Sequence, residues 1–366
     1  MAGPNSRLTE PYVILLLLSN DAHRNVDEVR AIDDPEQQNY QWTCFNRLKV
    51  RPLRQRIDAH HHLWKLGHFP YDWLSPDAPP RPFGDHTGIK HDYLASDYAR
   101  DMAGTGVVAS VFVESSANAP GAGEVEWVEG QADGGRMPAA SVGYVDLRRP
   151  DAGEVLSGFQ RSPRMRGIRM SLAWDATRPR WRFVETPDIM GTPEFRRGLA
   201  ELDRRGLVFD TLVVPAQLAE LAGVARAFPD LQIVVNHLGT PLHDTPQDAA
   251  EWSEGMRACA ACPNMAVKLS GLWVIDRGWA PERIAGPVRM VVEAFGADRC
   301  MWTSNYPVEK LMCRVDDQLR NLEAVLEDLP EDDKDMIFRG TAARVYRIPL
   351  AAEAAAVDGA RQSVAR

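Results

Sequence analysis

Eight short β-branched or apolar runs recur along the middle of the chain, and they constrain its fold more than any other feature. They span residues 56–62, 107–114, 139–146, 165–172, 206–214, 232–237, 265–270 and 300–305. Amphipathic stretches with helical spacing separate them, for example at 193–206 and 216–228. Because strands that alternate with helices form parallel sheets, eight such units within residues 55–348 predict a single (β/α)8 barrel of the TIM type in the α/β class.

The sequence also excludes two classes of ligand. No Gly-x-Gly-x-x-Gly motif follows the first predicted strand, so the main signal of a dinucleotide fold is missing and we expect no nucleotide cofactor. The chain has 42 Lys and Arg against 51 Asp and Glu, a formal net charge of −9. It therefore lacks the basic footprint with which proteins contact phosphates, and we expect a small-molecule substrate and no nucleic acid.

The predicted barrel has a segment on each side: residues 1–54 form an N-terminal extension and residues 349–366 a C-terminal tail. The longest early apolar run, Tyr12 to Leu18, is far shorter than the roughly 20 residues that a membrane span requires, so we expect no membrane partner. The five cysteines form no disulfide framework, which favours a cytoplasmic location. The sequence leaves open whether the chain forms a homo-oligomer.

Active sites of (β/α)8 barrels lie at the carboxyl ends of the strands. The first predicted strand ends in Asp58, Ala59, His60, His61 and His62. Because side chains alternate along a strand, Asp58, His60 and His62 are expected to share one face. Two imidazoles at this spacing can ligate one divalent ion, with Asp58 available to orient them.

Other strand ends carry further candidates. Glu114 closes the second predicted strand and can act as a base, a metal ligand or the partner of an arginine. Arg169 in the fourth can grip a substrate carboxylate or form a buried ion pair, with Glu114 as a candidate partner. His237 follows the sixth and suits acid–base catalysis or metal binding. Asn305 follows the eighth and can donate or accept hydrogen bonds but cannot act as a base.

The loop at 63–92, rich in proline and aromatic residues, is expected to serve as a lid or substrate wall, or simply to pack. Arginines and tryptophans at 173–192 indicate an apolar wall with anion recognition. The candidate substrate-binding residues are Arg169, His61, Trp64, Trp73 and Tyr306.

Seven motifs occur in one order along the predicted barrel: IDAHHHLW (57–64), VFVESS (111–116), RGIRM (166–170), VVNHLGTP (234–241), KLSGL (268–272), SNYPVEK (304–310) and GTAARVY (340–346). With them, the chain from about 55 to 348 resembles the amidohydrolase superfamily, specifically its amidohydrolase-related, lactonase-type branch. The resemblance implies a distorted barrel that activates water against a carbonyl. It maps the family's first-strand histidine pair onto His60 and His62, and its sixth-strand histidine onto His237.

Two departures from the family pattern concern the metal. Relatives that hold one tight metal usually add a histidine after strand five and an aspartate after strand eight. Here the stretch 209–215 has no histidine, and Asn305 stands where the aspartate is expected. Two arrangements therefore stay open: a divalent Zn or Mn ion on His60 and His62 with Glu114 as a substitute ligand, or a metal-free histidine cluster.

The leading hypothesis is a hydrolase that opens a lactone or similar cyclic ester of a small organic acid or sugar acid. His237 or Glu114 takes the proton of the attacking water. The pair His60 and His62 polarises the carbonyl, directly or through a metal. Arg169 then holds any substrate carboxylate, and Asn305 positions the water or donates to the oxyanion.

Two other functions are consistent with the same residues. One is a metal-dependent decarboxylase or hydratase of an unsaturated or aromatic acid, against which the two missing ligands count. The other is a barrel that binds a metabolite without turning it over. The three imidazoles argue against this last function, because a pure binder has less need of them.

Overall fold

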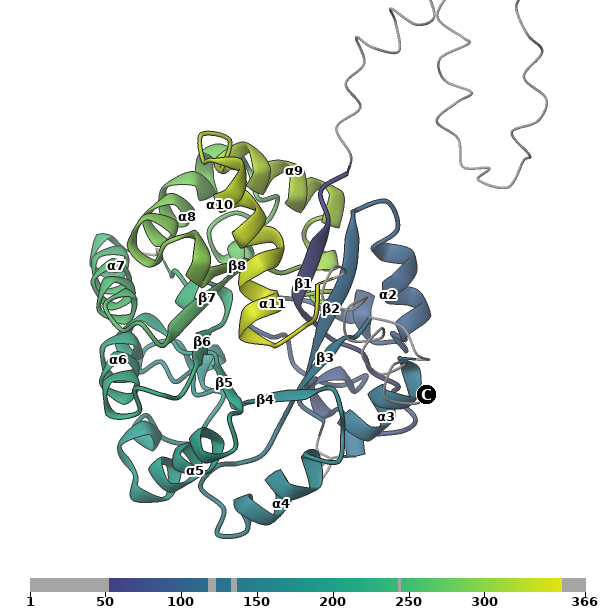
Figure 1. Ribbon diagram of the computed structural model, residues 1–366, viewed down its shortest axis with the longest axis vertical. Coiled ribbons are helices and arrows are strands. Elements are labelled where there is room, and N and C mark those ends of the chain that lie inside the picture. Colours follow the sequence, from purple (N-terminus) through teal and green to yellow (C-terminus); the bar gives the residue numbers. More distant parts are fainter. Residues whose placement is uncertain (1–52, 118–122, 133–136, 243–244, 351–366) are drawn as a thin grey trace, which may run out of the picture. The chain divides into compact units, whose positions relative to one another are not determined.

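The computed structural model describes residues 53–117, 123–132, 137–242 and 245–350. Nearly all of the predicted extension and tail lies outside these residues. Within them, eight parallel strands pair in the order in which they occur along the chain. Figure 1 shows these strands surrounded by helices. The predicted (β/α)8 barrel is confirmed.

Every strand falls inside one of the eight predicted runs. Every strand ends before its run does, because the main chain leaves the ladder there to form the loops of the site; His237 and Asn305, for example, adopt positive φ angles of 52°. The strands are β1 (Arg56–His61), β2 (Val107–Val113), β3 (Ala140–Gly143), β4 (Met165–Arg169), β5 (Val208–Thr211), β6 (Ile233–Val235), β7 (Met265–Leu269) and β8 (Cys300–Trp302).

Most helices follow the strands around the outside of the barrel, whereas α11 lies across its middle (Figure 1) and packs with the inner core. The two helices expected at 193–206 and 216–228 are present as α5 and α6, and Thr192 caps α5 by accepting a hydrogen bond from the main-chain N–H of Phe195. The helices are α2 (Ala95–Asp101), α3 (Gly123–Gln131), α4 (Ala152–Phe159), α5 (Pro193–Arg204), α6 (Leu218–Ala227), α7 (Pro246–Ala260), α8 (Pro281–Phe295), α9 (Val315–Val325), α10 (Glu331–Asp335) and α11 (Thr341–Val345).

Successive residues along a strand belong alternately to two apolar cores. Phe209 and Val235 belong to the cluster that packs against the surrounding helices. Their sequence neighbours Val208 and Val234 belong to an inner cluster that includes Tyr346, at the end of α11. This alternation is what a closed barrel requires, since one face of each strand meets the helices and the other the barrel interior.

The barrel closes between β1 and β8 through main-chain bonds just beyond the end of β8. The amide of Asn305 donates to the carbonyl of His60 (2.9 Å), and the amide of His62 donates to the carbonyl of Tyr306 (2.8 Å). The first and last strand ends, more than 240 residues apart in the sequence, are thereby joined at the mouth of the barrel.

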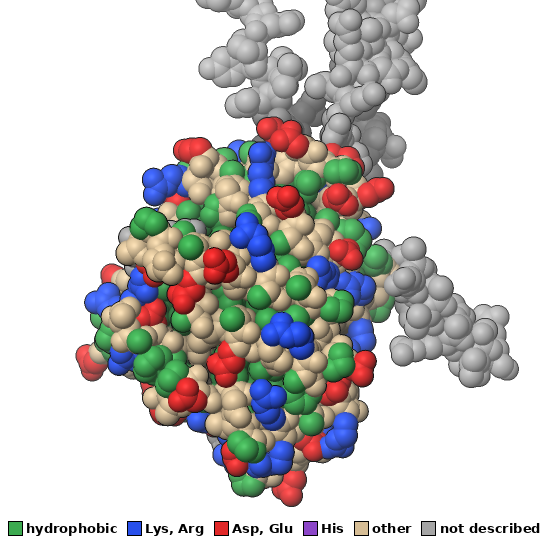
Figure 2. All heavy atoms as spheres, turned by 90° about the vertical axis from the view of Figure 1, so that its left-hand side faces the viewer, with side chains coloured by type: hydrophobic (Ala, Val, Ile, Leu, Met, Phe, Trp, Pro, Cys, Tyr) green, Lys and Arg blue, Asp and Glu red, His purple; other side chains and the backbone are tan. Residues whose placement is uncertain are grey.

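The outer surface carries mixed charge. On the face shown in Figure 2, basic and acidic side chains are interspersed rather than gathered by sign. None of the helices in the described part of the chain is both long enough and apolar enough to span a lipid bilayer.

Gly198 in α5 provides a test of how closely the helices pack on the barrel. A Cβ atom added there would lie 2.3 Å from the carbonyl oxygen of Leu147, whereas one added at Gly158 in α4 would meet only the end of the Arg161 side chain, at 3.8 Å. We expect Gly198→Ala to lower the free energy of unfolding by about 1–3 kcal/mol, because α5 must move away from main chain.

The matched control is Gly158→Ala. It makes the same change in a helix with room for a methyl group, so it should leave the free energy of unfolding unchanged or raise it by up to about 1 kcal/mol through helix propensity. Urea unfolding followed by circular dichroism measures both variants. Equal stabilities would contradict the packing described here.

Candidate active site

A pocket opens at the carboxyl ends of the strands, where the site was expected. Among the predicted site residues, His62, Trp73, Arg169, His237 and Asn305 line it. The complete lining comprises His62, Trp73, Arg81, Pro82, Phe83, Ser115, Ser116, Arg169, Ser171, Trp181, Phe183, Leu212, His237, Thr240, Gly271, Trp273, Val274, Asn305 and Val308.

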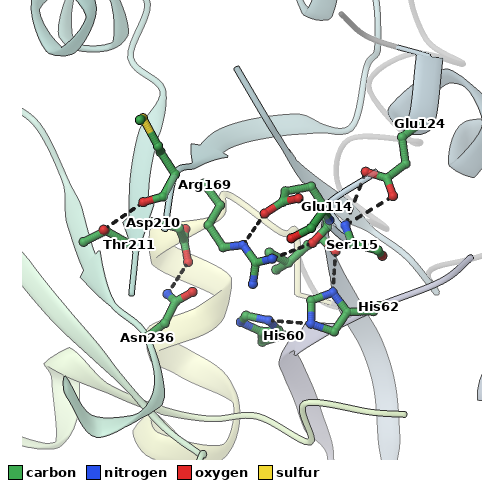
Figure 3. Close-up of polar contacts among 12 residues, drawn as sticks. His60, His62, Glu114, Ser115, Glu124, Arg169, Asp210, Thr211 and Asn236 are labelled. Carbon is green, nitrogen blue, oxygen red and sulfur yellow. Dashed lines mark hydrogen bonds and ion pairs between the residues drawn. The ribbon is translucent and has the colours of Figure 1, made fainter. Parts of the chain in front are cut away.

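A directed chain of hydrogen bonds fixes the predicted histidine pair. The Nε2 atoms of His60 and His62 lie 3.2 Å apart (Figure 3), and Nδ1 of His62 lies 2.9 Å from the carbonyl oxygen of Val113. On the other side, Nζ of Lys268 lies 3.3 Å from Nδ1 of His60. An ammonium group only donates, so we assign the His60 proton to Nε2, facing His62, and the His62 proton to Nδ1, facing Val113.

Lys268 is held in place by a buried ion pair. Its ammonium lies 2.5 Å from Oδ1 of Asp210, and both side chains are fully buried. Asp210 also accepts hydrogen bonds from the side-chain amide of Asn236 (Nδ2, 2.9 Å, Figure 3) and from the hydroxyl of Tyr346 (2.9 Å). Burial lowers the pKa of Lys268, and the Asp210 carboxylate opposes this shift. Neither residue was singled out from the sequence, although Lys268 opens the KLSGL motif.

His237 is the imidazole best placed to act as a base. It follows β6 and lines the pocket, with its ring 4.9 Å from that of His60 between centroids and its Nδ1 2.9 Å from Oγ of Ser270. Desolvation, followed by the charges of Arg169 and Lys268, lowers the pKa of His237 to about 3. The ring is therefore neutral at physiological pH.

The main chain around His237 depends on a glycine in the next strand-end loop. Gly271, at φ +69°, lies so close that an added Cβ would fall 2.5 Å from the Cβ of His237. Only glycine combines this conformation with this approach. The glycine of the KLSGL motif thus gives His237 the space to reach the pocket.

Glu114 and Arg169 form the ion pair that was one of the two alternatives for Arg169. Nε of Arg169 lies 2.5 Å from Oε1 of Glu114, and its Nη2 donates to the Glu114 carbonyl at 2.9 Å (Figure 3). The amide of Ser116 donates to Oε2 of the same carboxylate at 2.5 Å. Both carboxylate oxygens are therefore engaged. The prediction that Glu114 acts as a base or metal ligand does not fit this arrangement; it orients Arg169 instead.

Asp58 lies on a different side of β1 from the one predicted. The register of β1 with β2 shifts between Asp58 and His61, so strict alternation fails. The Asp58 carboxylate accepts hydrogen bonds from the amide (2.8 Å) and hydroxyl of Ser304 and from the hydroxyl of Tyr98 (2.9 Å). Burial raises its pKa to about 6. Asp58 therefore ties β1 to β8 and α2, and it does not line the pocket, contrary to its predicted catalytic role.

Three predicted substrate-binding residues also lie away from the pocket. His61 stacks on Tyr98 of α2, with 3.9 Å between ring centroids, because it points outward while its neighbours point inward. The buried indole of Trp64 and the buried hydroxyl of Tyr306 each donate to a main-chain carbonyl of a loop. Their polar groups are satisfied there, and none of the three belongs to the pocket lining.

Asn305 lines the pocket as predicted. Near it lies a buried acid, Glu309, that was not singled out from the sequence. Glu309, in the SNYPVEK motif, is fully buried and accepts a hydrogen bond from the amide of Gly271 at 2.5 Å. Burial raises the pKa of Glu309 to about 8, against the opposing influence of Gly271, Asn305 and Trp279.

The loops provide an aromatic wall and an arginine that the sequence analysis did not single out. Trp181 stacks on Trp273, with 6.0 Å between centroids and 3° between planes, and Arg81 from the loop after β1 joins them in the lining. Arg178, which was expected to contribute to anion recognition, pairs instead with Asp175 and Asp248.

Residues 57–348 match the family model described as Amidohydrolase. The chain belongs to the amidohydrolase family. It is 36% identical over 293 residues to an uncharacterized protein, y4mH, of Sinorhizobium fredii, a match that covers 80% of this chain and 98% of that protein. It is 31% identical over 299 residues to the L-fucono-1,5-lactonase of Burkholderia ambifaria, covering 80% of this chain and 96% of that enzyme.

Among solved structures, this amidohydrolase is similar to an amidohydrolase of Burkholderia multivorans crystallised with bound zinc. The TM-score is 0.68 at 27% identity, and the match covers 81% of this chain and 100% of that one. The family and the lactonase-named relative support a hydrolase of the lactonase-type branch.

The donor set at the mouth of this barrel does not fit a tightly held divalent metal. The described residues contain no group of three His, Cys, Asp or Glu side chains that could hold one. In the tautomers assigned above, the lone pair of His62 Nε2 accepts from His60, and the Glu114 carboxylate is engaged by Arg169. Lys268 adds a positive charge beside the histidine pair, which further opposes a cation there.

The hydrogen-bond chain predicts the tautomers of the two histidines. Long-range ¹H–¹⁵N correlation spectra of protein with ¹⁵N-labelled histidine should show His60 protonated at Nε2 and His62 at Nδ1. Lys268→Met removes the donor to His60 and should shift its tautomer signals, whereas Lys65→Met, at an exposed position, should leave them unchanged. A wild-type His60 protonated at Nδ1 would contradict the assignment.

Proposed function

We propose that this amidohydrolase hydrolyses a lactone or similar cyclic ester at the mouth of its barrel. The observation that carries the proposal is a neutral imidazole, His237, that lines the pocket together with Arg169 and Asn305. A base, a fixed cation and an amide donor in one pocket are the groups that ester hydrolysis requires.

His237 acts as the base in this mechanism. Nδ1 of His237 contacts Oγ of Ser270, and in the tautomer that this mechanism uses Nδ1–H donates to that oxygen and the Nε2 lone pair is available to water. Water attacks the carbonyl carbon while His237 takes its proton. The bond from that carbon to the ring oxygen then breaks, and His237 returns the proton to the leaving oxygen. The product is an open-chain hydroxy acid.

Arg169 stabilises the negative oxygen that forms during the attack. Glu114 holds its Nε and one terminal nitrogen contacts a carbonyl, so the guanidinium is oriented before the substrate arrives. A donor fixed in this way loses little free energy to reorganisation during the reaction. Asn305 adds an amide at the same mouth. His60 and His62 take no part in proton transfer in this mechanism, because the ring nitrogens of His62 are already engaged in hydrogen bonds.

No step of this mechanism uses a divalent metal. Zinc in the Burkholderia multivorans structure is a property of that protein. In this chain, the support for a metal-free mechanism is the incomplete donor set and the positive charge of Lys268 and Arg169 around it.

Replacing the base tests the mechanism. With a panel of γ- and δ-lactones and a pH indicator for the released acid, His237→Ala should lower kcat by about 10²–10⁴-fold, the usual contribution of a positioned general base. The control is His68→Ala, an exposed histidine in the loop after β1, which should keep wild-type turnover. Circular dichroism checks folding. Near-wild-type turnover in a folded His237→Ala would overturn the assignment, and release of CO₂ would instead support a lyase.

Removing metal gives an independent test. Protein dialysed against a strong chelator and checked by elemental analysis should retain full lactone hydrolysis, and added Zn²⁺ or Mn²⁺ should not raise it, because His60 and His62 are committed to each other and to Val113. Loss of turnover on dialysis that one equivalent of metal restores would contradict the metal-free mechanism.

A further inference from the structure

Arg81 lines the pocket, and no carboxylate in the described part of the chain neutralises its charge. Its guanidinium packs over the rings of Phe183 and Trp73, at 4.6 Å and 5.8 Å from their centroids. Within the described part of the chain, no carboxylate forms an ion pair with it, and its Nε is buried without a hydrogen-bond acceptor. Such a donor is usually satisfied in a folded protein.

The rest of the pocket does not compensate this charge. Among the described residues, its lining includes no Asp or Glu, and its two cationic side chains are Arg81 and Arg169. Arg169 is neutralised by Glu114, which leaves Arg81 in excess. Burial and the charge of Arg169 lower the pKa of Arg81, but a guanidinium stays protonated in proteins. A half-buried cation without a counter-ion is costly unless a ligand supplies the anion.

We propose that Arg81 binds a carboxylate carried by the substrate, so that the ester opened here is an anionic lactone. This inference rests on the proposed function and specifies its substrate class. The guanidinium presents parallel N–H donors, which match the two oxygens of a carboxylate. The stacked rings of Trp181 and Trp273 offer an apolar wall for the body of the ring.

The pocket favours a carboxylate over a hydroxyl-rich ligand. A hydroxyl group can accept from Arg81 but brings no negative charge to it, and the described lining offers no carboxylate for the hydroxyl to donate to. Its hydrogen-bonding side chains other than the arginines and histidines are few: Ser115, Ser116, Ser171, Thr240 and Asn305, beside indole donors.

The alternative for Arg81 is purely structural, a cation held between Phe183 and Trp73. Binding of a probe that cannot be hydrolysed separates the two. Tetrahydrofuran-2-carboxylate and tetrahydrofurfuryl alcohol share one ring and differ in charge, and neither contains an ester. Titration calorimetry should show the wild type binding the carboxylate about tenfold or more tightly than the alcohol, since a charge-assisted hydrogen bond discriminates by at least that factor.

Substitutions test whether the preference for the carboxylate probe depends on Arg81. Arg81→Met should abolish this preference while leaving the affinity for the alcohol unchanged. Arg81→Lys keeps the charge but loses the paired N–H donors of the guanidinium, so it should retain part of the preference. Arg283→Met, at an exposed arginine of α8 outside the pocket lining, should behave as wild type. Thermal unfolding checks that each variant folds. A folded Arg81→Met that keeps the preference, or a wild type without one, would overturn the proposal.

Kinetics tests the same charge on an ester. For 5-oxotetrahydrofuran-2-carboxylate, Arg81→Met should lower kcat/KM by about tenfold or more, and for the uncharged 5-(hydroxymethyl) analogue it should leave kcat/KM unchanged. If no lactone is hydrolysed but the wild type still prefers the carboxylate probe through Arg81, the lactonase proposal fails and the anion site stands. If both lactones are hydrolysed equally and Arg81→Met changes neither, the anion site fails and the lactonase proposal stands.

Discussion

The ion pair between Lys268 and Asp210 inside the barrel is the interaction on which the site depends. Both side chains are fully buried, and such a pair is tolerated only when further hydrogen bonds satisfy it. Tyr346 at the end of α11 and Asn236 after β6 supply them to Asp210, while the ammonium also donates to His60 Nδ1. One charge pair thereby connects β5, β6, β7 and α11 to the first-strand histidines and sets their tautomers.

The same positive charge shapes the chemistry at the mouth. Burial lowers the pKa of His60, His62 and His237, and the charge of Arg169 lowers each of them further, so the cluster is neutral and hydrogen bonds direct its lone pairs. Glu114 cancels the charge of Arg169, and no described side chain does so for Arg81. A pocket with one uncompensated guanidinium and an uncharged base is suited to a negatively charged ester, because the negative charge of the ligand neutralises the guanidinium.

Most of the fold and part of the site followed from the sequence. Each of the eight apolar runs contains one strand. A barrel strand is buried on both faces, so its sequence is a continuous apolar run that can be recognised from the segment alone. The rule that strand ends converge then located His62, Arg169, His237 and Asn305 in one pocket. It failed for Asp58 and His61, because a register shift in β1 turned one away from the pocket and alternation turned the other toward α2.

The sequence by itself thus determined which chemical groups arrive at the mouth of the barrel, since strand order and side-chain period are local properties. The tertiary structure alone decided which of them are free to react. Arg169 engages Glu114, 55 positions away, and Lys268 reaches His60 across 208 positions. Among the described residues, Arg81 contacts the rings of Phe183 and Trp73 but no carboxylate. Hydrogen-bond partners and desolvation act through space, so the state of each group is set by neighbours that its own segment of sequence does not contain.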